Sequence, residues 1–222
     1  ETMGRDAGWL AASCCVSGDV DLLVLPEVDF DNEAFLAEVQ KKFDEKGECY
    51  IVVSEGAHYA DGTYVSAGAT AHDGFAHAVL GGAGAVIKQM IIDAGIVPRG
   101  IVQDLSRAAR SSNFAQSLVD VTEAYELGMS AHMRSANPEF TAQVVGVKRE
   151  YDAQGSYGAK YFAGPASEFA NEVKHFPEEW ILPNYQGVTE EALEYFKPLM
   201  QGEPKLIMDG CMPATLEPFN KR

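Results

Sequence analysis

Residues 21–56 of this 222-residue chain read DLLVLPEVDFDNEAFLAEVQKKFDEKGECYIVVSEG, and this stretch decides the fold. It begins and ends with short, continuous apolar runs, the first closed by Pro26, a pattern typical of strands buried on both faces. Between them, apolar residues recur at helical spacing over about residues 33–46, with Asp31 among the N-cap candidates and Gly47 as the stop. Strand, helix and strand with short connections predict a parallel α/β arrangement.

The sequence on either side extends this alternation. A helix is expected to follow Arg5 and to run to about Ser17. Further along, we expect helices over about residues 80–94 and 117–135, and strands over residues 97–102 and 143–149. The last third changes character, with a Gly-, Tyr- and Ala-rich stretch, a proline-bracketed connector over residues 176–183, an amphipathic helix over about 188–200 and a proline-rich tail. In the helix over 117–135, five residues are expected to face inward: Val121, Ala124, Tyr125, Leu127 and Gly128.

Composition excludes several classes of protein. The formal net charge of −16 argues against a nucleic-acid binder, which needs an excess of Lys and Arg to neutralise phosphates. No apolar run reaches about 18 residues, so no membrane span is expected, and no signal peptide is apparent. The four cysteines have no zinc-ligand spacing and indicate free thiols in a cytoplasmic protein.

The opening residues Met3, Gly4 and Arg5 are the first candidate site. A helix that starts directly after them would place backbone N–H groups and a guanidinium at one N-terminus, a combination suited to a phosphate or sugar phosphate. Glu55 ends a predicted strand, and Arg107 and Arg110 follow another. Ligands of parallel α/β sheets gather at the carboxyl ends of strands, so these segments are expected to converge.

The charged candidates have a simpler explanation as solvated surface charges, which applies to Arg5, Glu55, Arg107 and Arg110. Other motifs are weaker. The glycines of residues 81–84 do not match a dinucleotide-binding loop and fit close helix packing better. The five histidines, His72 and His77 among them, contain no i,i+4 metal pair. We therefore expect no metal ligands in this chain.

Taken together, these motifs resemble the phosphofructokinase family. Residues 3–11 (MGRDAGWLA) resemble its fructose 6-phosphate-binding signature, and residues 52–57 (VVSEGA) resemble its second sugar-binding element. Residues 73–82 are similar to a loop and helix start of its pyrophosphate-dependent branch, and residues 105–110 lie where that branch carries a Tyr/His-x-x-Arg motif. Residues 120–128, 177–181 and 188–190 are similar to its later helices and C-terminal extension.

The resemblance implies a two-lobe phosphofructokinase architecture with a parallel Rossmann-like sheet flanked by helices, truncated at the N-terminus. Residues 1–112 would form the fructose 6-phosphate-binding lobe. Residues 113–222 would return to the phosphoryl-donor lobe. The implied glycolytic reaction transfers a phosphoryl group from pyrophosphate, or ATP, to the 1-hydroxyl of fructose 6-phosphate. Its Mg²⁺ ligands and its general-base Asp are expected upstream of this chain, which should be inactive alone.

The resemblance also assigns roles. Met3, Gly4, Arg5, Glu55 and Arg107 would contact the sugar phosphate, with Arg110 as a further candidate. The resemblance implies a homodimer or homotetramer, in which Arg99 would reach a neighbouring subunit's sugar site.

One residue departs from the family pattern. Asp104 stands where the family has Tyr or His, and a carboxylate facing the sugar phosphate would repel it. Either the loop register shifts or this contact is lost. Asp104 is consistent with an alternative function, a non-catalytic sugar-phosphate-binding relative or regulatory subunit. A separate alternative is a structural fragment that associates through an exposed half-sheet.

Overall fold

The computed structural model describes residues 1–66, 82–112 and 114–214. It divides into two compact units. Unit 1 comprises Glu1–Arg110 and Val173–Phe196, and unit 2 comprises Ser111–Glu172 and Lys197–Arg222. The loop over residues 73–80, which resembles the family and contains His77, lies outside the described residues, as does His72.

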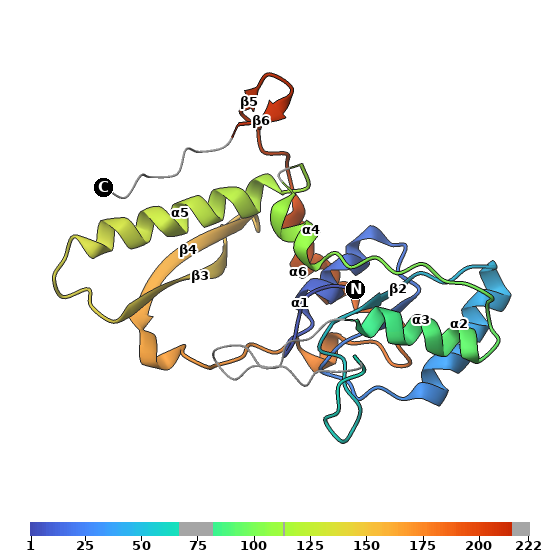
Figure 1. The fold of residues 1–222 in the computed structure, drawn as a ribbon. Coiled ribbons are helices and arrows are strands. Elements are labelled where there is room, and N and C mark those ends of the chain that lie inside the picture. The colour runs from blue at the N-terminus through green and yellow to red at the C-terminus, as the bar shows by residue number, and fades with distance from the viewer. Residues whose placement is uncertain (67–81, 113, 215–222) are drawn as a thin grey trace, which may run out of the picture. The chain divides into compact units, whose positions relative to one another are not determined.

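Unit 1 contains the predicted strand–helix–strand (Figure 1). Strands β1 (Leu22–Val24) and β2 (Ile51–Val53) pair in parallel, with Leu22 opposite Ile51. Helix α2 (Asn32–Lys46) connects them. The carboxylate of Asp31 accepts the N–H of Ala34 at 2.9 Å, and Gly47 ends the helix with a φ of 77°. The predicted parallel α/β arrangement is confirmed. It could be predicted because helix caps and buried strands leave patterns in the local sequence.

Helices cover both faces of this small sheet. Alternate residues of a strand point to opposite faces, so Leu22 and Val24 enter one apolar cluster and Leu23 enters another. The first cluster packs α2 and α3 (Ala83–Asp93) against the sheet. The second packs α1 (Trp9–Ser13), the 3₁₀ turn η1 (Cys14–Ser17), the 3₁₀ turn η3 (Glu178–Trp180) and α6 (Glu190–Phe196).

The strand predicted over residues 97–102 is not present. Thr2 lies beside the end of β2, where its N–H donates to the Val53 carbonyl at 2.9 Å and its carbonyl accepts the Glu55 N–H at 3.0 Å. The position that a third strand would take is therefore occupied. Pro98 has no N–H to donate, and Ile101 is 90% exposed.

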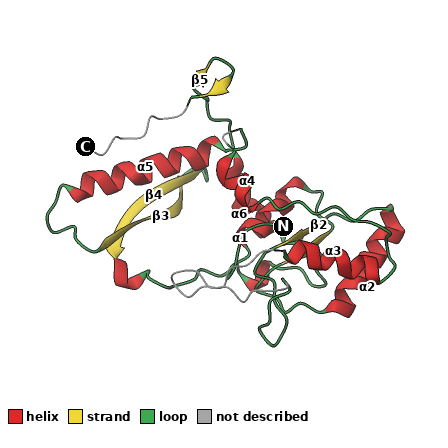
Figure 2. Cartoon of the chain, viewed as in Figure 1, coloured by secondary structure: helices red, strands yellow, loops and turns green. Residues whose placement is uncertain are grey.

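Unit 2 consists of a long helix on a hairpin (Figure 2). Helix α5 (Leu118–Ser135), predicted from the sequence, begins at Ser117, whose hydroxyl accepts the Asp120 N–H at 3.0 Å. Strand β3 (Gln143–Tyr151) pairs antiparallel with β4 (Tyr157–Pro165). A strand over residues 143–149 was predicted from the sequence and corresponds to β3, whereas β4 was not predicted.

The remaining elements of the chain are α4 (Ser106–Ser111), η2 (Ala166–Glu168), η4 (Lys197–Met200) and a small hairpin of β5 (Met208–Asp209) and β6 (Met212–Pro213).

The prediction that Val121 and Tyr125 of α5 face inward is wrong for this chain. Val121 is 36% exposed and Tyr125 is 69% exposed, and none of the described side chains of unit 2 is fully buried. One helix on a two-stranded hairpin leaves most of its own surface in solvent. Within the described ranges, no helix is long and apolar enough to cross a membrane.

Candidate functional site

Residues 2–4 do not start a helix: Thr2 pairs in parallel with Ser54 at the end of β2. Helix α1 begins at Trp9, with Gly8 as its N-cap, so the expectation that Gly4 and Arg5 open the helix is wrong. The reason is tertiary. Pairing with β2 holds Thr2 extended, and the N–H of Gly4 donates to Oε1 of Glu55 at 3.2 Å.

This pairing brings two of the predicted site segments together. Besides the Gly4–Glu55 hydrogen bond, the hydroxyl of the buried Ser54 donates to the carbonyl of Gly4 at 2.6 Å. Residues 54–55 and residues 2–4 are thus joined by main-chain and side-chain bonds on the carboxyl side of β2. A carboxylate offers about four acceptor positions, so the Glu55 side chain retains capacity beyond the Gly4 N–H.

Two glycines permit the close approach of these segments. Gly4 has a φ of 141°, and a Cβ there would lie 2.6 Å from the carbonyl oxygen of Ala7. At Gly56 a Cβ would lie 1.8 Å from the carbonyl oxygen of Arg5. A larger residue at Gly56 would push the Arg5 main chain away from the end of β2.

Arg5 presents a partly exposed guanidinium beside these segments. Its Nε–H donates to Oδ2 of Asp6 at 2.8 Å, and the two side chains are 29% and 41% exposed. A guanidinium carries five N–H donors, and this bond engages one of them. The arrangement suits bidentate binding of a phosphate.

The start of α4 is anchored to the same opening segment. The N–H of Leu105 donates to the carbonyl of Glu1 at 3.0 Å, and the carbonyl of Leu105 accepts the Ala109 N–H at 2.7 Å. Arg107 lies in the first turn of α4, and Arg110 lies exposed in its last turn. The start of α4 is therefore bonded to Glu1, which lies four residues before Arg5 in the sequence.

Arg99 lies exposed in the loop between α3 and α4. The proposed reach of Arg99 to a second subunit stays a prediction.

Two carboxylates that position the site were missed by sequence reasoning. Glu27 accepts the Gly8 N–H at 2.8 Å and the Phe176 N–H at 2.8 Å, so it caps α1. Glu1 accepts the N–H groups of Gly82 and Gly84 at 2.8 and 2.9 Å and so caps α3. The position of Glu27 just after a buried strand was an available signal, as it was for Glu55.

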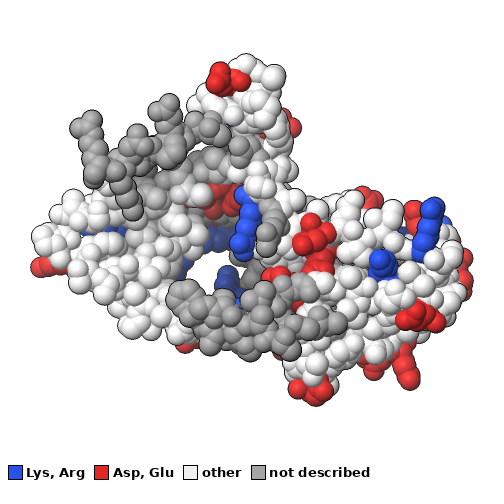
Figure 3. Space-filling model, viewed as in Figure 1, with Lys and Arg blue, Asp and Glu red and all other residues white. Residues whose placement is uncertain are grey.

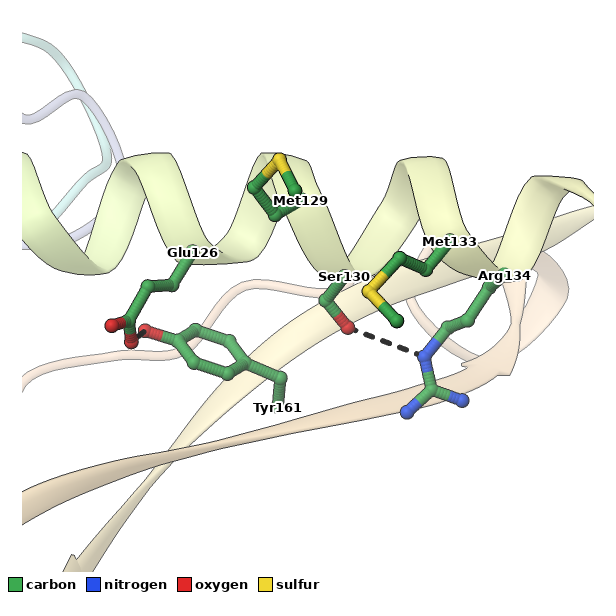
Figure 4. A pocket seen from close by; sticks show the side chains of 6 residues that line it. All are labelled: Glu126, Met129, Ser130, Met133, Arg134 and Tyr161. Atoms are coloured by element: carbon green, nitrogen blue, oxygen red, sulfur yellow. Dashed lines mark hydrogen bonds between the residues drawn. The ribbon is translucent and has the colours of Figure 1, made fainter.

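Two hollows in the described surface are lined by residues other than these. One of about 570 Å³ lies on α5 and β4, where Glu126 and Arg134 flank Met129 (Figure 4). There the Tyr161 hydroxyl donates to Glu126 at 2.9 Å, and burial together with this bond raises the pKa of Tyr161 to about 12. A second of about 530 Å³ lies between α2 and α3. Both hollows are shallow, and neither is lined by Gly4, Arg5 or Glu55.

The described residues hold no metal-binding group. No cluster of three or more His, Cys, Asp or Glu side chains among them could bind a metal ion. On the face that Figure 3 shows, the acidic side chains are spread over the chain and do not gather in one patch. All four cysteines are free, and burial raises the pKa of Cys15 and of Cys49 to about 11, which keeps these two thiols protonated.

Comparison with known proteins decides the family. The sequence model of the family described as phosphofructokinase matches residues 1–132 of this chain. The chain belongs to the phosphofructokinase family. The resemblance carried by residues 3–11 and 52–57 is thereby confirmed.

Two curated relatives show which phosphofructokinases this chain is similar to. It is 37% identical over 210 residues to the pyrophosphate–fructose 6-phosphate 1-phosphotransferase of Halomonas elongata, covering 91% of this chain and 48% of the relative. It is 38% identical over 220 residues to the enzyme of the same name from Methylococcus capsulatus, covering 96% and 51%. The chain thus spans about half the length of the curated relatives it matches.

A solved structure supports the phosphofructokinase fold. The pyrophosphate-dependent phosphofructokinase of Nitrosospira multiformis superposes with a TM-score of 0.73 at 26% identity, covering 96% of this chain and 50% of that one. The predicted fold class, a phosphofructokinase-type α/β architecture with a parallel sheet, is confirmed.

Proposed function

We propose that this chain is the sugar-phosphate-binding part of a pyrophosphate-dependent 6-phosphofructokinase. The observation that carries the proposal is the joining of the Met3–Arg5 segment to Glu55 at the carboxyl end of β2. The reaction would transfer a phosphoryl group from pyrophosphate to the 1-hydroxyl of fructose 6-phosphate in glycolysis. The names of the relatives favour pyrophosphate over ATP as the donor.

The chemistry of this segment suggests separate roles. Arg5 and Arg107 bind the 6-phosphate, because guanidinium groups match phosphate geometry. Glu55 accepts hydrogen bonds from sugar hydroxyls, while Met3 and Gly4 line the sugar with their backbone. Arg110 adds positive charge at the rim, and Arg99 contributes to the site of a second subunit in a homodimer or homotetramer.

The remaining chemistry belongs to the half of the protein that this chain does not span. The described residues hold no cluster suited to Mg²⁺. The Mg²⁺ ligands and the general-base Asp are proposed to lie in that other half. Of residues 113–222, which are expected to return to the donor lobe, we propose that those in unit 2 do so, because residues 173–196 pack within unit 1. The lack of fully buried side chains in the described part of unit 2 supports this role, since such a unit needs further packing partners. We propose a cytoplasmic location, the usual compartment of free thiols.

Titration calorimetry with fructose 6-phosphate tests the proposed site. The chain should bind saturably, and Arg5→Ala should weaken binding about 10- to 100-fold, the range for a lost hydrogen bond between charged groups. Arg134→Ala is the matched control, because Arg134 lies in α5 of unit 2, and it should leave the affinity unchanged. Absence of saturable binding, or equal affinity of Arg5→Ala and the parent chain, would contradict the proposal.

Activity measurements separate this proposal from a non-catalytic relative. The chain alone should show no turnover of fructose 6-phosphate with Mg²⁺ and pyrophosphate, because it lacks the donor site. The full-length protein should turn over with pyrophosphate and much more slowly with ATP. A full-length protein that binds fructose 6-phosphate without turnover with either donor would instead be a regulatory or non-catalytic relative.

A further inference from the structure

The start of α4 is held by bonds on both sides of Leu105. The carboxylate of Asp104 accepts the N–H of Ser106 at 2.8 Å. The N–H of Leu105 donates to Glu1 at 3.0 Å, and its carbonyl closes the first helical turn with Ala109 at 2.7 Å. The first N–H groups of a helix have no partners inside the helix, so a side-chain acceptor just before it satisfies one of them.

This geometry gives the Asp104 carboxylate a role other than facing a ligand. An ionised carboxylate is favourable at a helix N-terminus, where the N–H groups carry partial positive charge. Asp104 is exposed, so solvent also screens its charge. A carboxylate at this position is therefore compatible with a phosphate site nearby.

We propose that Asp104 is a positioning residue for substrate binding. By bonding the Ser106 N–H, it orders the first turn of α4, and this turn sets the backbone position of Arg107, the next residue along. The inference rests on the proposed function, in which Arg107 binds the 6-phosphate. Asp104 itself does not contact the substrate.

Two substitutions separate the hydrogen bond of Asp104 from its charge. Asp104→Asn keeps an acceptor oxygen and removes the charge, whereas Asp104→Ala removes both. In Asp104→Ala the Ser106 amide should exchange hydrogen about fivefold faster, the factor for one lost hydrogen bond. The affinity for fructose 6-phosphate should fall by up to the same factor, because only the ordered turn is competent to bind. Asp104→Asn should stay within about twofold of the parent in both measurements.

The full-length enzyme adds a kinetic readout. Asp104→Ala should raise the KM for fructose 6-phosphate with little change in kcat, and Asp104→Asn should restore the parent KM. Asp31→Ala is the matched control, because Asp31 caps α2 through the Ala34 N–H at 2.9 Å. It should loosen α2 and leave fructose 6-phosphate binding unchanged.

The outcomes distinguish the two proposals. Unchanged exchange at Ser106, or faster exchange with unchanged affinity, would overturn the positioning role while the proposed function stands. Asp104→Asn behaving like Asp104→Ala, or binding much more tightly than the parent, would also overturn it, since the charge would then be the cause. No binding of fructose 6-phosphate by the parent chain would remove the proposed function, and the positioning role with it.

Discussion

The two units of this chain contain similar amounts of regular structure but differ in how that structure is packed. In unit 1, helices cover both faces of the β1–β2 pair, and rings such as Phe35 and Phe176 are fully buried. In unit 2, α5 lies on the β3–β4 hairpin, and their contacts include hydrogen bonds such as that from Tyr157 to Glu123 at 2.5 Å. Secondary structure formed by strong local signals therefore does not by itself produce a core. The candidate site lies in the unit that has one.

The largest expected effect comes from removing a core ring. Phe35 is fully buried and lies 5.0 Å from Phe30 between ring centroids. Phe35→Ala should lower the free energy of unfolding by about 3–5 kcal/mol, because it leaves a cavity. Phe169→Ala is the matched change in unit 2, where Phe169 is 40% exposed, and should cost less than about 1 kcal/mol. Urea unfolding measures both, and equal losses would show that the two units are packed alike.

A smaller effect, with opposite signs in the two units, is expected from glycine substitutions. Gly56→Ala places a methyl group against the Arg5 carbonyl and should lower the free energy of unfolding by about 1–3 kcal/mol. It should also weaken fructose 6-phosphate binding. Gly128→Ala lies within α5, with no atom within 4 Å of the added carbon, and should stabilise the helix by about 0.5–1 kcal/mol. Thermal unfolding followed by circular dichroism compares them, and a stable Gly56→Ala protein with normal affinity would contradict the tight approach.

The smallest effect is a pH dependence confined to unit 1. Burial of Asp21 would raise the pKa of its carboxyl, but the Lys46 ammonium and the Tyr50 N–H at 2.8 Å outweigh burial and lower that pKa. A lowered pKa in the folded state means that the unfolded chain binds the proton first. The stability contributed by Asp21 is therefore present above about pH 4 and is lost as the pH falls below it.

Asp21→Asn tests this sign. The variant should be less stable than the parent at pH 7, and the difference should shrink as the pH falls from about 5 to 3. Amide exchange in β1 and β2 reports on unit 1, while that in β3 and β4 reports on unit 2 and should not respond. A difference that grows on acidification would mean that the folded pKa is raised instead.

Local signals in the sequence account for the elements that were predicted correctly. Asp31 and Gly47 bound α2, and Ser117 begins α5, because caps act within one turn of the helix. The motifs containing Arg5 and Glu55 were also visible as residues. The strand expected over residues 97–102 failed for the opposite reason, since a strand needs a free partner edge and Thr2 occupies that position.

The sequence by itself determined the strand–helix–strand order, the helix boundaries set by caps, the free thiols and the family. Tertiary structure alone decided how the site is assembled. Glu55 bonds Gly4 across 51 residues, Glu27 caps α1 from 19 residues away, and the opening segment pairs with β2 and does not start a helix. The physical reason is that a backbone N–H donates to whichever acceptor the fold brings within reach, and acceptors so distant in sequence leave no local pattern.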